Sequence, residues 1–303
     1  MKPEVTVILP VFNAEQTLQR AINSILSQSL RNFEFLIIDD GSNEETKKIL
    51  RKQKDPRISI IELPENRGVA TARNVGLANA RGEFVCTMDA DDRSHPNRLE
   101  IQKTFLQKNQ NITLVGSQAI KTFSNRSELL KYQPGDSYIK SRLLFLNGSS
   151  IINVSTFFRK DFTVKKNLFY PPARTDGDHL FLINLMINGA AFEIIEKPLC
   201  QFYRHKNNLT KETIENMISM EKEKLKMRTY LIQLFWPNLT KEHSAQLARI
   251  FANKKITSQN SRLPEEKLIN HCLDEKRSLY GESRSLLNQI MKTKFSYYKL
   301  QRI

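Results

Sequence analysis

Long apolar runs are missing from this chain of 303 residues. No stretch approaches the roughly 18 consecutive apolar residues that a membrane-spanning helix needs. The first residues also lack the basic, apolar and small-residue segments of a secretory signal. Cys86, Cys200 and Cys272 are isolated, so their spacing matches neither a zinc site nor a disulfide framework. We therefore expect a cytoplasmic protein, or one held peripherally at the cytosolic face of an inner membrane.

Acidic residues are scarce relative to basic ones, with 32 Asp and Glu against 47 Lys and Arg, which gives a net charge of +15. Such a balance favours anionic partners, whether a membrane, a nucleic acid or an acidic substrate. The aromatic residues are not interleaved with the basic ones as a base-stacking platform requires, so we expect no nucleic-acid partner. No G-x-G-x-x-G follows the first predicted strand, which argues against a dinucleotide-binding dehydrogenase.

Strand and helix patterns alternate over the first hundred residues. Short apolar runs predict strands at Val5–Leu9, Phe33–Ile38, Ile58–Leu63 and Phe84–Met88, and helical spacing predicts helices at Ala14–Gln28, Glu44–Lys54 and Val69–Ala80. This order is typical of right-handed βαβ units and a parallel sheet. Ligands of such sheets bind outside the carboxyl ends of the strands. Four polar turns should gather there, namely Pro10–Asn13, Asp39–Ser42, Glu65–Gly68 and Asp89–Asp92.

The remaining two thirds of the chain carry weaker patterns. Leu143–Phe145 and Val154–Phe158 fit either strands or buried segments, whereas Leu180–Ile187 predicts a helix that ends at Asn188-Gly189. Phe192–Ile195 and Leu199–Tyr203 are typical of short strands. From Lys211 onward the pattern is helical and basic.

Three carboxylates lie within four positions at Asp89-Ala90-Asp91-Asp92, directly after an apolar strand. Side chains at i and i+2 of an extended segment point the same way, so Asp89 and Asp91 can converge on one hard cation. Mg²⁺ or Mn²⁺ carrying a nucleotide diphosphate is the favoured partner, because such ions take one or two protein carboxylates. The competing interpretations are a solvated acidic turn, or a cap of the helix that begins near Pro96.

Two other turns offer groups that suit a nucleotide. Asp39 can accept hydrogen bonds from a base or a ribose hydroxyl, although an ordinary Asp-rich turn before a helix explains the same residues. Arg73 offers a planar donor head suited to a base or diphosphate, and the small residues around it allow close backbone approach. The alternative interpretation is that Arg73 is an exposed arginine on a tightly packed helix.

Two later motifs are ambiguous when taken alone. Asp176-Gly177-Asp178-His179 precedes an apolar helix, so a carboxylate there suits either a general base or a helix cap. His205 lies in a basic, polar stretch, where a solvated side chain is the ordinary expectation.

Taken together, these motifs resemble an inverting glycosyltransferase of family 2, of the bacterial surface-polysaccharide type. The matching segments are Pro10–Asn13, Asp39–Ser42, Asn66–Gly76, Gly82–Asp92 and, on the acceptor side, Leu143–Phe145 to Ser155–Lys160. The resemblance covers about residues 4–210. It implies the α/β GT-A nucleotide-diphospho-sugar transferase fold, with a Rossmann-like, mostly parallel sheet flanked by helices. We expect a catalytic domain over residues 1–210 and a basic, mainly helical extension over residues 211–303.

The resemblance also implies roles for individual residues. Asp39 and Arg73 would contact the base, Asp89 the ribose or sugar, and Asp91 the metal, with Asp89 and His205 completing the metal site. The nucleotide-sugar site as a whole would comprise Pro10, Val11, Asn13, Asp39, Asp40, Arg73, Asp89 and Ala90. Asp176 would be the catalytic base. Thr175 stands where the family usually has glutamate, so Asp178 competes for that role.

The implied reaction is a single displacement by an acceptor hydroxyl on a nucleotide-diphosphate sugar, expected to be a UDP-sugar. The acceptor would be a glycan or a lipid-linked glycan, and the enzyme a hexosyl- or N-acetylhexosaminyl-transferase that depends on Mn²⁺ or Mg²⁺. Thr175 leaves open a catalytically weak relative that only binds nucleotide sugar or glycan. The tail fits either a peripheral membrane anchor or a helical appendage with solvated lysines.

Overall fold

The computed structural model describes residues 2–136, 139, 151–172, 177–203, 225–226, 228–230, 232–233 and 238–251. The chain divides into two compact units, the first formed by Met1–Ile139 with Ser149–Asn208 and the second by Lys140–Gly148 with Leu209–Ile303. In the second unit, helix α9 spans Lys241–Phe251. The domain boundary after residue 210 stays a prediction, and the predicted segment Leu143–Phe145 lies outside the described residues.

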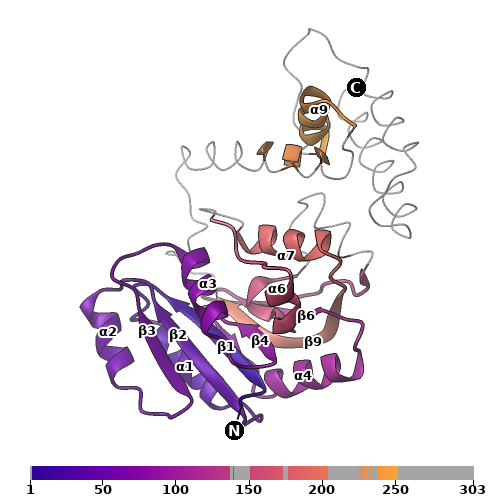
Figure 1. Ribbon diagram of the computed structural model, residues 1–303. Coiled ribbons are helices and arrows are strands. Elements are labelled where there is room, and N and C mark those ends of the chain that lie inside the picture. Colours follow the sequence, from indigo (N-terminus) through magenta and orange to yellow (C-terminus); the bar gives the residue numbers. More distant parts are fainter. Residues whose placement is uncertain are drawn as a thin grey trace. The chain divides into compact units, whose positions relative to one another are not determined.

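Four parallel strands form the first half of the sheet, in the spatial order β3-β2-β1-β4 (Figure 1). They span Val5–Val11 (β1), Phe33–Asp39 (β2), Ile58–Glu62 (β3) and Phe84–Thr87 (β4). The helices between them are α1 (Leu18–Leu26), α2 (Glu44–Arg51) and α3 (Val69–Asn79). All seven elements stand where the sequence predicts them, which confirms the βαβ pattern.

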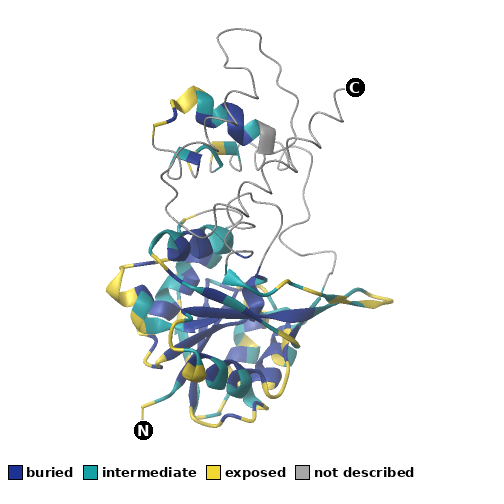
Figure 2. Cartoon of the chain, turned by 90° about the vertical axis from the view of Figure 1, so that its right-hand side faces the viewer, coloured by how far each residue is buried: buried dark blue, intermediate teal, exposed yellow. Residues whose placement is uncertain are grey.

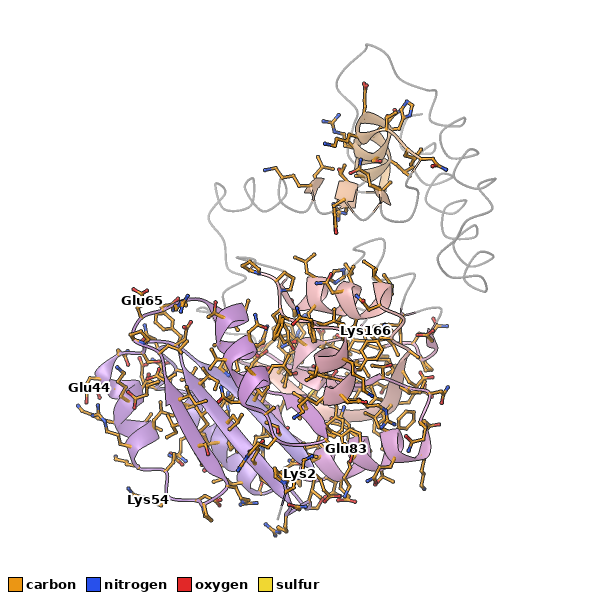
Figure 3. The ribbon with its side chains drawn as sticks, viewed as in Figure 1. Lys2, Glu44, Lys54, Glu65, Glu83 and Lys166 are labelled. Atoms are coloured by element: carbon orange, nitrogen blue, oxygen red, sulfur yellow. The ribbon has the colours of Figure 1, made fainter. Side chains whose placement is uncertain are left out.

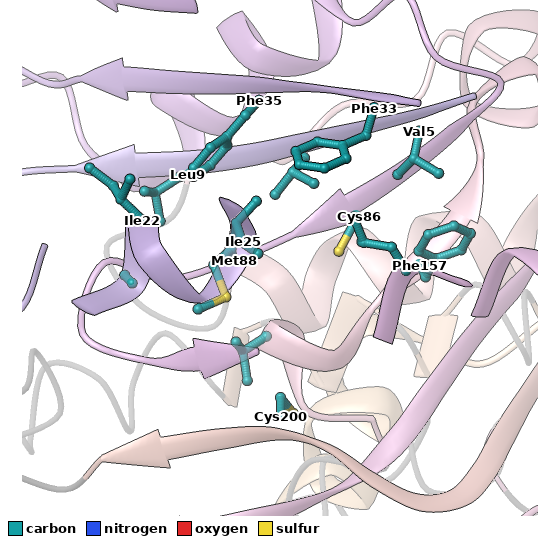
Figure 4. Packing of buried hydrophobic residues seen from close by; sticks show 14 of the residues in the cluster. Val5, Leu9, Ile22, Ile25, Phe33, Phe35, Cys86, Met88, Phe157 and Cys200 are labelled. Atoms are coloured by element: carbon teal, nitrogen blue, oxygen red, sulfur yellow. The ribbon is translucent and has the colours of Figure 1, made fainter. Parts of the chain in front are cut away.

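Burial on both faces of β1 explains why this half is so regular. Its residues Val5 and Leu9 join Ile22 and Ile25 of α1 in one apolar cluster (Figure 4). The next residue on the opposite face, Ile8, lies against α3. A Cβ on Gly76 would come within 2.5 Å of its Cγ2, so only glycine lets the helix approach this closely.

The second half of the sheet is mixed. It contains β5 (Arg93–Ser94), β6 (Leu114–Thr122), β7 (Ser127–Leu130), β8 (Phe157–Arg159) and β9 (Phe192–Tyr203). Strand β8 pairs antiparallel with both β4 and β6, while β9 runs parallel to β6. Helices α4 (Arg98–Lys108), α6 (Lys160–Lys165) and α7 (Gly177–Ile187) and the short 3₁₀ helix η1 (Asn153–Ser155) complete this half. The α/β class predicted from the sequence is confirmed.

Several boundaries differ from those predicted. Residues Val154–Phe158 divide between η1 and the start of β8, which resolves the ambiguity left by their periodicity. The two short strands expected around Pro198 form the continuous strand β9, and its pairing with β6 shifts register near Pro198. Such a shift accommodates proline, because its nitrogen has no hydrogen to donate to the ladder.

Charged side chains cover the outside of the first unit. Figure 3 labels six such exposed residues on its periphery, which are Lys2, Glu44, Lys54, Glu65, Glu83 and Lys166. Strands β1, β2 and β4 are buried along their whole length (Figure 2). In the part of the chain that the structure describes, no helix has the length and apolar character needed to cross a bilayer.

Candidate active site

The turn after β2 presents a buried carboxylate at the carboxyl end of the sheet. Asp39 is fully buried, and its Oδ1 accepts a hydrogen bond from the Ser42 backbone N–H at 3.0 Å. Its Oδ2 is also buried and finds no partner among the described residues. A buried carboxylate oxygen without a donor is costly, and a bound ligand can supply that donor.

Asp40 connects this turn to the loop before α3. Its two carboxylate oxygens accept hydrogen bonds from the backbone N–H groups of Arg67 and Gly68, each at 2.9 Å. Gly41 between the two aspartates and the loop has φ +73°, and a Cβ there would lie 2.6 Å from the carbonyl carbon of Glu65. The structure therefore gives Asp40 a positioning contact, while direct contact with a nucleotide sugar stays a prediction.

The end of β1 lies against the same turn. Pro10 and Val11 are buried in the strand, which continues two residues beyond its predicted end. Asn13 has φ +48°; its backbone N–H donates to Ser42 Oγ at 3.1 Å, and its Oδ1 accepts from the Asn43 N–H at 2.8 Å. The predicted convergence of these strand-end turns is thus present in the structure.

Arg73 on α3 reaches the acidic turn that follows β4. Its Nη2 donates to Asp89 Oδ1 at 2.9 Å, which joins two residues predicted to bind the donor. Burial disfavours the charged guanidinium, but Asp89, Tyr170 and Asp178 outweigh that effect and raise the pKa of Arg73. Its Nε is buried and has no partner among the described residues. The Arg73 side chain is therefore a buried, charged donor head.

The rest of the acidic turn is held from two sides. Arg20 on α1 donates from Nη2 to the Asp91 carbonyl oxygen at 2.6 Å, and its guanidinium lies over the Tyr203 ring at 3.8 Å. Asp92 is buried and accepts a hydrogen bond from the Tyr203 backbone N–H at 3.0 Å. Burial, together with the negative charges of Asp89 and Asp91, raises the pKa of Asp92 well above its usual range.

The donor set of this turn fits a hard divalent cation. Within the described residues there is no group of three or more candidate metal-ligating side chains. A nucleotide-bound Mg²⁺ or Mn²⁺ needs only one or two protein carboxylates, because phosphate and water oxygens complete its shell. Asp89 and Asp91 are partly exposed oxygen donors, and three carboxylates that repel one another favour a bound cation. His205, the further predicted ligand, lies outside the described residues.

Of the two candidate bases, the structure describes Asp178 and not Asp176. Asp178 lies in the first turn of α7 and is close enough to Arg73 and Tyr170 to raise the pKa of both. It therefore shares the electrostatic environment of the predicted donor site. Which of the two aspartates acts as the base stays a prediction.

Tyr170 is a site residue that the sequence did not single out. Its backbone is held at two points by Asn74 on α3, whose amide donates to the Tyr170 carbonyl and accepts from its N–H, both at 2.8 Å. Its ring stacks on Phe181 of α7, with centroids 4.0 Å apart. No local pattern marks the tyrosine, whereas Asn74 follows Arg73 directly in the motif that suggested the donor site.

The sequence did not single out Arg98 either, because no local pattern marks it. Its side chain is fully buried and donates to two backbone carbonyls, those of Thr87 at 3.1 Å and Thr156 at 3.2 Å. It also donates to Ser94 Oγ at 3.2 Å and to Gln102 Oε1 at 2.9 Å. Thr87 ends β4 and Ser94 lies in β5, so one guanidinium holds both sides of the acidic turn.

Comparison with known proteins identifies the family to which this chain belongs. The profile described as "Glycosyl transferase family 2" matches residues 6–165, just over half of the chain. The chain is a member of glycosyl transferase family 2. The matched residues include all four strand-end turns described above.

Individual relatives are similar over different shares of their length. An uncharacterized glycosyltransferase of Haemophilus influenzae is 38% identical over 119 residues, which are 39% of this chain and 48% of the relative. The chain thus matches about half the length of that protein. The Escherichia coli protein WfgD, a UDP-Glc:alpha-D-GlcNAc-diphosphoundecaprenol beta-1,3-glucosyltransferase, is 29% identical over 212 residues, or 70% of this chain and 79% of WfgD.

Solved structures confirm the GT-A fold. The crystal structure of S. aureus TarS 1-349 in complex with UDP-GlcNAc superposes with a TM-score of 0.63, over 97% of this chain and 88% of TarS 1-349. The two sequences are only 18% identical, so the similarity concerns the fold alone.

Proposed function

We propose that this family 2 member is an inverting glycosyltransferase that moves a sugar from a nucleotide-diphosphate donor to a hydroxyl of a glycan or lipid-linked acceptor. A UDP-sugar is the proposed donor, and synthesis of a bacterial surface polysaccharide is the proposed setting. UDP-GlcNAc in the TarS complex and the UDP-Glc specificity in the name of WfgD support a UDP-sugar.

The observation that carries this proposal is the gathering of Asp39, Arg73 and Asp89 at one end of the sheet, where we propose that they bind the donor. Asp39 offers a buried oxygen without a partner among the described residues, and Arg73 joins α3 to Asp89 of the acidic turn. Asp39 suits a base or ribose, Arg73 suits a base or diphosphate, and Asp89 suits a ribose or sugar. They come from β2, α3 and the end of β4, so the fold itself assembles them.

In the proposed site, Asp91 holds Mn²⁺ or Mg²⁺ together with Asp89 and His205. The bound ion supplies charge neutralisation for the departing diphosphate. The contribution of Arg20 is positional, because its hydrogen bond to the Asp91 carbonyl at 2.6 Å fixes the backbone that carries this carboxylate. Arg73 orients Asp89 in the same way from the opposite side of the turn.

Asp176 is the proposed base that takes the proton of the acceptor hydroxyl, with Asp178 as the alternative. A base of this kind contributes about 10²- to 10⁴-fold to the rate. We expect Asp176→Asn to lose transfer while its affinity for the nucleotide survives, and Asp178→Asn to keep transfer. Steady-state turnover and calorimetric nucleotide binding of both variants decide between them. Near-normal turnover of Asp176→Asn would remove it from this role.

The donor is identified by thermal-shift measurements with UDP-, GDP- and dTDP-sugars, each with and without Mn²⁺. We expect a metal-dependent shift with a UDP-sugar, and no such shift with any of the three would contradict the proposal.

Thr175 favours a second candidate, a catalytically weak protein that only binds nucleotide sugar or glycan. Hydrolysis of the selected nucleotide sugar in the presence of metal separates the two, because a pure binding protein releases no nucleotide.

Peripheral membrane contact through the basic segment 211–303 would place the site near a lipid-linked acceptor. About half of the net positive charge lies after residue 210, which supports attraction to anionic lipids. Co-sedimentation of the protein with vesicles containing anionic lipid should therefore decrease as salt increases. Equal sedimentation with neutral and anionic vesicles, or none, removes this part of the proposal.

A further inference from the structure

Two buried polar atoms beside the donor site lack partners among the described residues. They are the Nε of Arg73 and the hydroxyl oxygen of Tyr170. Both residues are more than nine-tenths buried, with exposed fractions of 7% and 2%. Leaving a buried donor or acceptor unpaired costs about 1–3 kcal/mol, so two such atoms on neighbouring residues call for an explanation.

The two atoms are chemically complementary, and the side chains that carry them are close to each other. The guanidinium carbon of Arg73 lies 5.4 Å from the centre of the Tyr170 ring. The Nε–H group is a donor, and a phenolic oxygen is an acceptor as well as a donor. A hydrogen bond between them would satisfy both. Arg73 instead directs its Nη2 to Asp89 Oδ1 at 2.9 Å.

The tyrosine is the fixed member of this pair. Asn74 holds its backbone through two hydrogen bonds of 2.8 Å, and Phe181 holds its ring by stacking at 4.0 Å. Within the described residues, the guanidinium of the arginine makes one hydrogen bond, to Asp89, which is itself partly exposed. Of the two side chains, Arg73 is therefore the one that can move.

We propose that Tyr170 is a positioning residue whose hydroxyl receives the Nε–H of Arg73 when a ligand engages Asp89. Asp89 pairs with Arg73 in the free protein and releases it to the tyrosine when the carboxylate turns to the donor. The new hydrogen bond satisfies both buried atoms and so favours the ligand-bound arrangement. Because Phe181 belongs to α7, the same tyrosine links the donor side of the site to the helix that begins at Gly177.

A double-mutant cycle on stability tests this exchange without any ligand. Tyr170→Phe should leave the urea midpoint of the wild-type protein unchanged or raised, because the hydroxyl has no partner to lose. In an Asp89→Ala background, Arg73 is released to the tyrosine, and Tyr170→Phe should lower the midpoint. Tyr230→Phe is the matched control, since Tyr230 is 59% exposed; it should change neither background.

Equal effects of Tyr170→Phe in the two backgrounds would overturn the proposal. A lower midpoint for Tyr170→Phe in the wild-type background would overturn it as well, because the hydroxyl would then be bonded in the free protein. The conservative change removes one oxygen and keeps the stacked ring, so folding should survive. Urea unfolding of the four proteins of the cycle, followed by circular dichroism, gives the midpoints.

Calorimetry with Mn²⁺ and UDP-glucose or UDP-N-acetylglucosamine tests the link to the ligand. This arm rests on the proposed function, since it assumes that the donor engages Asp89. Tyr170→Phe should bind the better of the two donors about 3- to 10-fold more weakly than the wild type, as expected for one lost hydrogen bond. Coupling in the stability cycle without donor binding by the wild type would sink the proposed function and leave the positioning role standing.

Discussion

Two groups of aspartates lie at the carboxyl ends of β2 and β4, the strands on either side of β1, and they make different contacts. Asp40, after β2, has both carboxylate oxygens bonded to the backbone N–H groups of Arg67 and Gly68. After β4, burial together with the negative charges of Asp89 and Asp91 raises the pKa of Asp92. Acidic residues at a strand end can thus stabilise a loop, or they can concentrate negative charge for a cation.

This difference has consequences for stability. A carboxylate that accepts two backbone hydrogen bonds stabilises the fold, because charge-assisted bonds are the stronger class. Like charges held close together destabilise it unless a cation is present. Replacing Asp40 should therefore lower stability more than activity, whereas replacing a carboxylate after β4 should lower activity more than stability. The following predictions test that contrast.

Asp91→Ala should have the largest effect. We expect it to abolish sugar transfer, a loss of at least about 100-fold, together with metal-dependent nucleotide binding. The urea midpoint without metal should be unchanged or higher, because one of three repelling charges is removed. Turnover, calorimetry with Mn²⁺ and UDP, and urea unfolding measure the three quantities. Retained metal-dependent binding would contradict the assignment of Asp91.

Arg98→Met should have the largest effect on stability. It removes the donors that hold the carbonyls of Thr87 and Thr156, and hydrogen bonds to charged groups contribute about 1.5–3 kcal/mol. The free energy of unfolding, measured in urea, should decrease by at least that amount. Arg93→Met changes an exposed arginine of the adjoining strand β5 and serves as the control. Equal losses for the two variants would show that burial of Arg98 is not what matters.

Asp40→Asn should lower stability by about 1–3 kcal/mol, because an amide cannot accept two N–H bonds through both of its terminal atoms. Asp39→Asn is the matched comparison. It keeps one accepting oxygen, and Asp39 Oδ2 has no partner among the described residues, so the loss should be smaller. If Asp39 contacts the base, Asp39→Asn should weaken UDP binding more than Asp40→Asn does. Urea unfolding and calorimetry with UDP give the two rankings.

Glu34 allows a pH test at a carboxylate away from the acidic turn, and we expect the smallest effect here. Burial opposes its ionisation, but hydrogen bonds from Thr6 and Arg81 hold its pKa below the ordinary value. The stabilisation is therefore present above about pH 4.3, the pKa of an unperturbed glutamate, and is lost as the pH falls through the lowered value. The difference between the urea midpoints of the wild type and Glu34→Gln should be full at pH 6 and should shrink as the pH falls below about 4.3. A difference that grows as the pH falls would contradict the assigned cause.

The exposed Glu83 gives the control for this measurement, since Glu83→Gln should leave the midpoint unchanged over the same range of pH.

The parallel half of the fold could be predicted from the sequence because its signals are local. Buried strands such as β2 are short apolar runs bounded by polar turns, and the α1 pattern repeats at helical spacing. Because parallel strands end at the same edge of a sheet, these signals also predict that Asp39 and Asp89 lie at one end. For the same reason, the family resemblance could be recognised from these segments alone.

The residues that hold the site in place could not be predicted in this way. Arg20 bonds to Asp91 across 71 positions, and Asn74 bonds to Tyr170 across 96. Nothing near Arg20 in the sequence distinguishes it from a solvated arginine on an amphipathic helix. The unpaired oxygen of Tyr170 is visible only when its surroundings are known. Contacts at such separations depend on the completed fold, so periodicity and motif spacing contain no signal for them.

Pro10 has a consequence for motion at the proposed donor site. Strand β1 pairs with β4 only as far as Ile8 and Thr87, whereas its pairing with β2 continues to Val11 and Asp39. The nitrogen of Pro10 faces β4 and carries no hydrogen, so the ladder cannot extend toward the acidic turn on that side. The turn can open without breaking strand pairing. In hydrogen exchange, amides after Met88 should open by local fluctuation, while that of Asp40, bonded to the Val11 carbonyl at 2.8 Å, should exchange far more slowly.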